Sequence, residues 1–184
     1  MKLITSASID ELIARAAGQA RRRLNLNVHE SPSDPIQRLF VAAVRGSYFR
    51  PHRHSAKSEF AVVIRGRFDV VTFDDAGCVL ERHTVGPGAE AAAFEMPANT
   101  WHSWIPLADD AVFLEVKQGP YDPQSAAEFA GWSPAEGTPQ AAAFAERLQK
   151  AKPGECVALA WFPDGDAPPP ARRSRCQIAP PQKL

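Results

Sequence analysis

Cysteine is scarce in this sequence. The chain has three cysteines, Cys78, Cys156 and Cys176, and none forms a Cys-x-x-Cys pair. An odd number at these spacings predicts no disulfide framework, and a reducing cytoplasm is the expected compartment. The opening residues, MKLITSASIDEL, lack the apolar core of a secretory signal. Cys78, which follows a turn, is interpreted as a packing residue.

Excess charge and long apolar runs are also missing. The chain carries 21 basic and 21 acidic side chains, so its formal net charge is zero. That balance argues against nucleic acid as a partner and against a polybasic membrane anchor. No run approaches the roughly 18 apolar residues that a membrane-spanning helix needs. Proline, in contrast, is abundant, with 17 residues, which indicates many turns.

The N-terminal segment predicts a helix. Ser8 and Glu11 have the spacing of a capping box, and apolar residues recur at helical intervals from Ile9 to Ala20. The run Arg21–Arg23 follows, where positive charge suits the C-terminal end of the helix dipole. We interpret this run as a solvated helix end in preference to a binding patch.

The central part of the chain has a β pattern. Short runs rich in Val, Phe, Ile and Leu are separated by turn residues, and no helical pattern lies between them. This arrangement predicts an antiparallel sandwich or barrel. The runs are RLFVAAV (38–44), FAVVIRG (60–66), RFDVVTF (67–73), CVLERHTV (78–85) and AVFLEV (111–116).

The C-terminal third returns to loops and one short helix. Thr138 and Pro139 have the chemistry of an N-cap and a first helical position, and apolar residues follow at helical spacing. The last residues are rich in Pro and Arg, which predicts partial disorder. The sequence therefore divides into an N-terminal helix and lead-in (1–35), a β-barrel (36–120), a loop with a helix (121–152) and a tail (153–184).

One stretch carries candidate metal ligands. His52 and His54 are two residues apart, so on a strand both imidazoles point to the same face. Glu59 follows after a small turn, and His102 comes from a later β segment, PANTWHSW. Three nitrogens and one oxygen are a typical ligand set for a divalent transition metal ion. The remaining histidines, His29 and His83, are interpreted as surface or hydrogen-bonded residues.

The spacing of these residues resembles the cupin superfamily. Gly46-x5-His52-x-His54-x4-Glu59-x6-Gly66 matches the first cupin motif without a gap, and Gly88…Pro97-x-Asn99-x2-His102 is similar to the second. The spacer after Gly88 is longer than usual, and Asn99 replaces the usual glycine. Asn tolerates the left-handed backbone conformation, so the turn can be kept.

The resemblance extends to one group of cupins. N-x-H at Asn27 and His29, together with DPIQRLF, RPHRH, VKQGPYDP and WSPAEGTP, resembles the WbuC family over residues 1–150. The resemblance implies a single cupin (double-stranded β-helix, jelly-roll) barrel, mainly β, with one metal ion (Fe, Zn, Ni or Mn) in its mouth. It also implies a role in surface polysaccharide biosynthesis, on a sugar or nucleotide-sugar.

Further polar residues are candidates for the same pocket. Alternation along the strand of His52 predicts that Tyr48 and Arg50 also point inward, and a buried Arg50 needs an anionic partner such as a substrate group or Glu115. Glu115 and Lys117 share one strand face, which is either solvent-exposed or in the pocket. Arg38, on its own strand, likewise points either to solvent or into the pocket. For Trp104, packing in the core is the favoured interpretation over stacking on a ligand.

Two functions remain open at this point. The first is a metal-dependent isomerase, epimerase or oxygenase, with Tyr48 and Glu115 as candidate catalytic residues and Arg50, Arg38, Lys117 and Trp104 as candidate substrate contacts. The second is a cupin that binds or senses a small ligand without catalysis, around a structural metal. In both cases the expected ligand is small, polar or anionic, and a homodimer is expected because pairing covers an exposed sheet edge.

Overall fold

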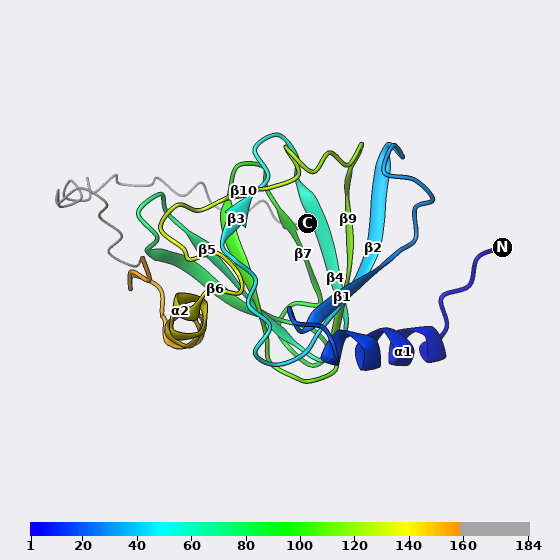
Figure 1. The fold of residues 1–184 in the computed structure, drawn as a ribbon, viewed down its shortest axis with the longest axis horizontal. Helices are drawn as coiled ribbons and strands as arrows, with labels where there is room; N and C mark the ends of the chain where they lie inside the picture. Colours follow the sequence, from blue (N-terminus) through cyan, green and yellow to red (C-terminus); the bar gives the residue numbers. More distant parts are fainter. Residues whose placement is uncertain (159–184) are drawn as a thin grey trace.

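The computed structural model describes residues 1–158. Two five-stranded antiparallel sheets pack face to face, and one helix lies against the outer side of each (Figure 1). Sheet A has the order β1-β2-β9-β4-β7, and sheet B has the order β10-β3-β8-β5-β6. Neither helix has the length and apolar character needed to cross a bilayer.

The strands of sheet A are β1 (Arg23–Asn27), β2 (Ile36–Ala43), β9 (Ala111–Gln118), β4 (Glu59–Arg65) and β7 (Ala93–Met96). Those of sheet B are β10 (Glu128–Phe129), β3 (His52–Arg53), β8 (Trp101–Pro106), β5 (Phe68–Phe73) and β6 (Val79–Val85). The five strands predicted from the β pattern are confirmed as β2, β4, β5, β6 and β9. The short strands β1, β3, β7 and β10 carry too few residues for a clear alternation.

Side-chain alternation explains why β5 carries apolar residues on both of its faces. Phe68 and Val70 point between the sheets, into a core that includes Trp104 and Phe113. Val71 and Phe73 point to the other face of sheet B, against helix α2 (Pro139–Lys150). Because both faces of this strand are covered, it needs no polar side to meet solvent.

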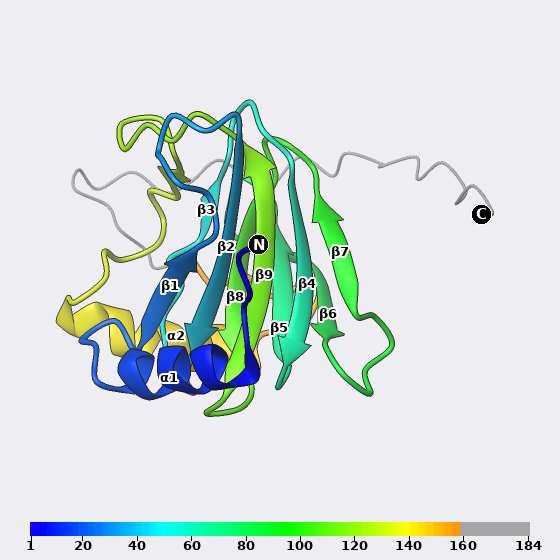
Figure 2. The same ribbon diagram turned by 90° about the vertical axis from the view of Figure 1, so that its right-hand side faces the viewer.

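Helix α1 (Ser6–Ala17) begins and ends earlier than its sequence pattern predicts. Thr5 is the N-cap, and its capping box is completed by Ser8, so the prediction of a box formed by Ser8 and Glu11 is wrong. Gly18 ends the helix, and Arg23 is the first residue of β1. Figure 2 shows α1 across the lower end of sheet A, where it packs on β1 and β2.

Helix α2 agrees with the prediction. Thr138 is its N-cap, Pro139 is its first residue, and Ala141, Phe144 and Leu148 are buried. After the helix the chain returns to the start of β6, where Val79 N donates to Glu155 O at 2.9 Å and Cys78 forms a disulfide with Cys156. The interpretation of Cys78 as a packing residue is therefore wrong, and so is the prediction that the cysteines form no disulfide, for Cys78 and Cys156. Of the predicted tail (153–184), residues 159–184 lie outside the described residues.

Three motif positions have the backbone conformation that the motif requires. Gly46 and Gly66 have φ of 85° and 60°, and a Cβ on Gly66 would lie 2.8 Å from Ala111 Cα. Asn99 has φ of 62°, which confirms that it adopts the left-handed turn in place of glycine. Its backbone N–H donates to His54 O at 2.8 Å, so this turn lies directly beside a candidate ligand.

Candidate metal centre

Three histidines converge on one point between the sheets. His52 lies on β3 directly opposite His102 on β8, and His54 follows β3. Each offers a ring nitrogen within 4.8 Å of the other two. His102 is fully buried and His54 nearly so. The prediction that these three residues come together is confirmed.

The outer nitrogen of each ring is fixed by the backbone. The Nδ1 atoms of His52, His54 and His102 lie 2.9, 2.6 and 2.8 Å from the carbonyl oxygens of Arg50, Ala126 and Thr100. Because a carbonyl can only accept, each Nδ1 carries the proton and donates it. In the neutral form of each ring, Nε2 is therefore left with its lone pair free, as metal-ligating histidines require.

Glu59, the first residue of β4, faces these rings from sheet A. Its Oε2 lies 3.0 Å from His54 Nε2, and its Oε1 lies 3.5 Å from His102 Nε2. Among the described residues, His54 Nε2, His102 Nε2 and Glu59 Oε1 are buried and make no well-directed hydrogen bond. Buried polar atoms without partners are costly, so their convergence fits a bound cation.

The electrostatics of the metal-free cluster are dominated by Glu59. Burial would raise the pKa of the Glu59 carboxyl, but its contacts with His102 and His54 outweigh burial and hold that pKa well below its usual value. Burial, followed by the repulsion of His102, lowers the pKa of His52 to about 3. His52 is therefore neutral at ordinary pH, which is the form that binds a metal ion.

Metal affinity is expected to fall as the pH drops. Burial opposes a proton on His102, but attraction to Glu59 outweighs it, so the pKa of His102 is raised. Since a metal ion binds neutral imidazole, it must displace that proton, and affinity should decrease as pH falls through the raised pKa. Chelator-competition titrations over a series of pH values measure this, and an affinity independent of pH would contradict it.

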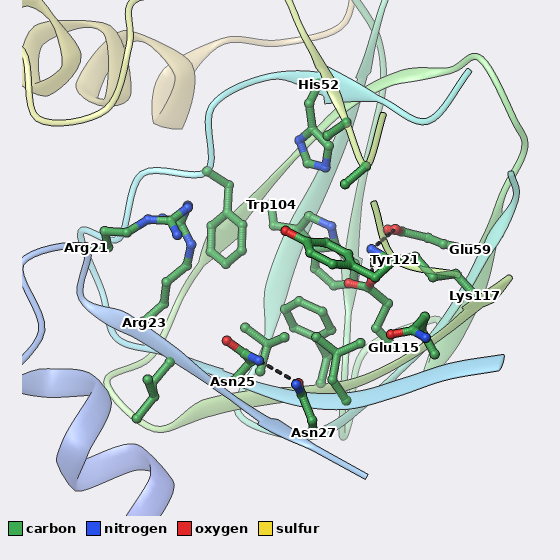
Figure 3. Close-up of a pocket in the computed structure, with 18 of the residues that line it drawn as sticks. Arg21, Arg23, Asn25, Asn27, His52, Glu59, Trp104, Glu115, Lys117 and Tyr121 are labelled. Carbon is green, nitrogen blue, oxygen red and sulfur yellow. Dashed lines mark hydrogen bonds and ion pairs between the residues drawn. The ribbon is translucent and has the colours of Figure 1, made fainter. Parts of the chain in front are cut away.

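His52, His54 and Glu59 line one wall of a cavity of about 820 Å³. Figure 3 shows Glu59, Lys117 and Glu115 on one side of this cavity and Arg21 and Arg23 on the opposite side. Trp104 lines it while stacking on Phe113, with ring centroids 4.0 Å apart. The cavity gives a ligand direct access to the point where the histidines converge.

Glu115 and Lys117 lie inside this cavity, which decides between the two orientations left open by the sequence. The Lys117 ammonium pairs with Glu115 and lies 3.9 Å from Glu59 Oε2. Burial, followed by the charge of Glu59, raises the pKa of Glu115. Burial would lower the pKa of Lys117, yet the charges of Glu115 and Glu59 raise it.

Arg50 also lines the cavity, but the anionic protein partner expected for it is wrong. Its Nε donates to Ser133 Oγ at 3.2 Å, and its Nη2 donates to Ala130 O at 3.2 Å. Both acceptors are neutral. The Arg50 guanidinium is therefore anchored by Ala130 and Ser133, without charge compensation from Glu115.

Two other predicted site residues lie elsewhere. Tyr48 packs against Phe144 of α2, and its hydroxyl donates to Pro134 O at 3.1 Å. The alternation fails because residues 46–51 are not a strand, so Phe49 points inward instead. Arg38 is 47% exposed beside Asp34, and its neighbour Gln37 lines the cavity. The inward placements predicted for Tyr48 and Arg38 are therefore wrong.

Several cavity residues were missed from the sequence. Arg21, Arg23, Asn25, Tyr121, Phe129 and Glu136 all line the cavity. Gly18 was the signal in the sequence that could have indicated Arg21 and Arg23. A glycine at this position predicts the end of the helix, which leaves both arginines outside it. His29, which was interpreted as a surface or hydrogen-bonded residue, also lines the cavity, and its Nδ1 lies 2.9 Å from Arg38 O, as the second of these alternatives predicts.

Comparisons with known proteins find partial similarities. A model of a domain of unknown function (DUF6016) matches residues 4–85, and no curated protein matches the chain. The two packed five-stranded antiparallel sheets have the jelly-roll barrel architecture predicted from the sequence. KdgF from a Halomonas species is 22% identical with a TM-score of 0.44, and the match covers 55% of this chain and 83% of KdgF.

Two further solved structures are similar. An oxalate oxidase in complex with glycolate is 16% identical with a TM-score of 0.43, covering 58% of this chain and 54% of the oxidase. A sugar phosphate isomerase of the cupin superfamily from Silicibacter pomeroyi is 22% identical with a TM-score of 0.44, covering 56% and 64%. At these scores the likeness concerns the barrel, and function must be argued from the site itself.

Proposed function

We propose that this protein binds one divalent transition metal ion through His52, His54, His102 and Glu59, and that the ion and the adjoining cavity bind a small polar or anionic metabolite. The observation that carries the proposal is the convergence of three histidine ring nitrogens beside the buried Glu59 carboxylate, with His52, His54 and Glu59 on the cavity wall. An ion with these four ligands can keep positions open for substrate, where it would polarise a carbonyl or hydroxyl group.

The charge of the cavity favours an anionic ligand. Its lining holds four cationic side chains, Arg21, Arg23, Arg50 and Lys117, against three carboxylates, Glu59, Glu115 and Glu136. With a divalent ion the net charge would rise from +1 to +3. Arg50 has only neutral partners among the described residues, so it is the natural first contact for a ligand carboxylate or phosphate.

Glu115 is the candidate proton carrier of the site. Its carboxyl group lies in the cavity and pairs with Lys117, and burial raises its pKa. Lys117 holds it in place and can stabilise the carboxylate once the proton has left. This pair supports an isomerase or epimerase reaction, in which a proton is moved on a bound metabolite.

The finer assignments rest on the resemblance to the WbuC family. That resemblance favours a sugar or nucleotide-sugar of surface polysaccharide biosynthesis as the ligand, and a homodimer as the assembly. A cytoplasmic location is proposed from composition, although the Cys78–Cys156 disulfide is unusual for a reducing compartment. The alternative is a cupin that binds or senses its ligand without catalysis; exposure of the centre to a large cavity favours ligand access over a purely structural metal.

Metal analysis and a ligand screen test the proposal. The purified protein should carry one divalent ion per chain, and sugar phosphates and sugar acids should raise the melting temperature of the metal-loaded protein more than that of the stripped protein. Turnover of a ligand that raises the melting temperature would show that the protein is an enzyme and not only a binding protein. Protein without stoichiometric metal, whose ligand response is unchanged by His52→Ala, would refute the proposal.

A further inference from the structure

The edge strand β1 presents a polar row to the cavity, away from the metal centre. Strand alternation places Arg23, Asn25 and Asn27 on its inner face, opposite Ala43, Val41 and Leu39 of β2. The row covers about 13 Å at the usual rise per residue. A ligand that extends along it from the metal centre is therefore elongated.

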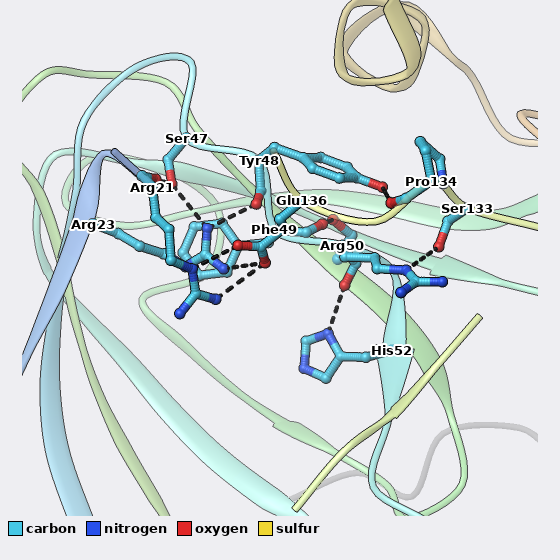
Figure 4. A network of polar contacts seen from close by, with 11 residues as sticks. Arg21, Arg23, Ser47, Tyr48, Phe49, Arg50, His52, Ser133, Pro134 and Glu136 are labelled. Atoms are coloured by element: carbon cyan, nitrogen blue, oxygen red, sulfur yellow. Dashed lines mark hydrogen bonds and ion pairs between the residues drawn. The ribbon is translucent and has the colours of Figure 1, made fainter. Parts of the chain in front are cut away.

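Arg21 and Arg23 close the far end of this row around a single carboxylate (Figure 4). Arg21 Nε lies 2.6 Å from Glu136 Oε2, and Arg21 Nη2 lies 3.1 Å from Glu136 Oε1. Arg23 Nη2 lies 2.5 Å from the same Oε1. Two guanidinium groups thus share one carboxylate, so this end of the cavity keeps an excess of one positive charge.

The two arginines differ in exposure: the Arg21 side chain is 62% exposed, whereas Arg23 is largely buried. The Arg23 side chain is 10% exposed, and its guanidinium lies over the Phe49 ring at 4.3 Å. Its other close acceptors, Tyr48 O at 2.7 Å and Ser47 Oγ at 3.4 Å, are neutral. Burial of a charge that protein groups do not fully balance is costly, and a ligand anion would relieve the cost.

We propose that Arg21 and Arg23 form a second ligand subsite, which binds an anionic phosphate or carboxylate group of an elongated ligand whose other end lies at the metal centre. The proposal rests on the proposed function for the placement of that other end. Asn25 and Asn27 follow Arg23 on the same face of β1, and Asn25 Nδ2 donates to Asn27 Oδ1 at 2.6 Å. This leaves Asn25 Oδ1 as an acceptor and Asn27 Nδ2 as a donor for hydroxyl groups of the ligand.

The subsite can be tested without any metal. The metal-stripped full-length protein is titrated with inorganic phosphate or with acetate at constant ionic strength, and binding is followed by NMR shifts of amides along β1. NMR is preferred to melting temperature because phosphate stabilises proteins generally by its exclusion from their surface. Saturable binding of phosphate would indicate that the anionic group of the natural ligand is a phosphate ester. Saturable binding of acetate alone would indicate that it is a carboxylate.

Two variants with opposite expected signs separate a ligand subsite from a structural ion pair. Arg21→Gln removes one cation and should weaken anion binding by roughly tenfold. Glu136→Gln removes the competing carboxylate and should tighten anion binding several-fold. The matched control is Arg15→Gln, an exposed arginine of α1 paired with Glu11, which should leave the affinity unchanged.

The proposal is overturned if neither anion binds saturably, or if Arg21→Gln behaves like Arg15→Gln. It is also overturned if Glu136→Gln lowers stability without tightening anion binding, because a purely structural ion pair would give that result. Glu136→Gln keeps the test decisive should Arg21→Gln fail to fold. If the anion titration fails but the purified protein binds a divalent ion, the second subsite alone is refuted. If the purified protein binds no divalent ion, the proposed function is refuted.

Discussion

Replacing His102 by alanine is expected to lower the affinity for a divalent ion by more than about 100-fold, since loss of a mere hydrogen-bonding partner of a ligand already costs 10–100-fold. His102 is the most buried of the three histidines, and its Nδ1 is held by Thr100 O, so no other described side chain can take its position. Competition with a chromophoric chelator measures the affinity of both proteins.

The matched control for this substitution is His83→Ala. His83 lies on β6 with its side chain 63% exposed and does not belong to the cluster, so its loss should leave metal affinity unchanged. Because His102→Ala also leaves a cavity, unfolding of the metal-free proteins must be measured alongside. A folded His102→Ala protein that binds the ion as tightly as the original would contradict the proposed ligand set.

Loss of the Cys78–Cys156 disulfide is expected to lower the free energy of unfolding by about 2–4 kcal/mol. The two cysteines are 78 residues apart, so the bond closes a loop that contains β8, β9 and α2. Constraining so long a loop removes much conformational freedom from the unfolded chain. Denaturant unfolding of the variant with both Cys78→Ser and Cys156→Ser measures the effect.

Two comparisons test whether the bond itself is responsible. The unsubstituted protein in reducing agent should unfold at the same denaturant concentration as the double variant. Cys176→Ser, which leaves the bond intact, should unfold like the oxidised protein. Equal stability of the oxidised, reduced and double-variant proteins would show that the bond does not stabilise the fold.

The barrel was predictable because its strands carry strong local signals. The apolar residues of β5 and the turn residues around it indicate a strand, and the structure agrees. The candidate ligands were predictable for a similar reason, since His52 and His54 share a strand face. Asn99 shows that even a departure from the motif could be judged correctly, from the backbone conformation the turn requires.

The remaining features depend on contacts that local sequence does not encode. Tyr48 was predicted inward by extending strand alternation into residues that form no strand. Arg21 and Arg23 were attributed to a helix end, whereas Glu136, more than a hundred residues later, draws them into the cavity. The pairing of Cys78 with Cys156 likewise requires the chain to return to β6 after α2, which no spacing rule predicts.

The carbonyl that fixes His54 belongs to Ala126, beyond the last long strand of the barrel. The same segment holds Arg50 through Ala130 and Ser133, and the carbonyl of Arg50 in turn fixes His52. All four candidate ligands lie before residue 120, yet two of them are oriented from outside that range. The functional unit of this protein is therefore larger than the part that carries its motifs, and a homologue could lose its metal through changes in this segment while keeping every ligand.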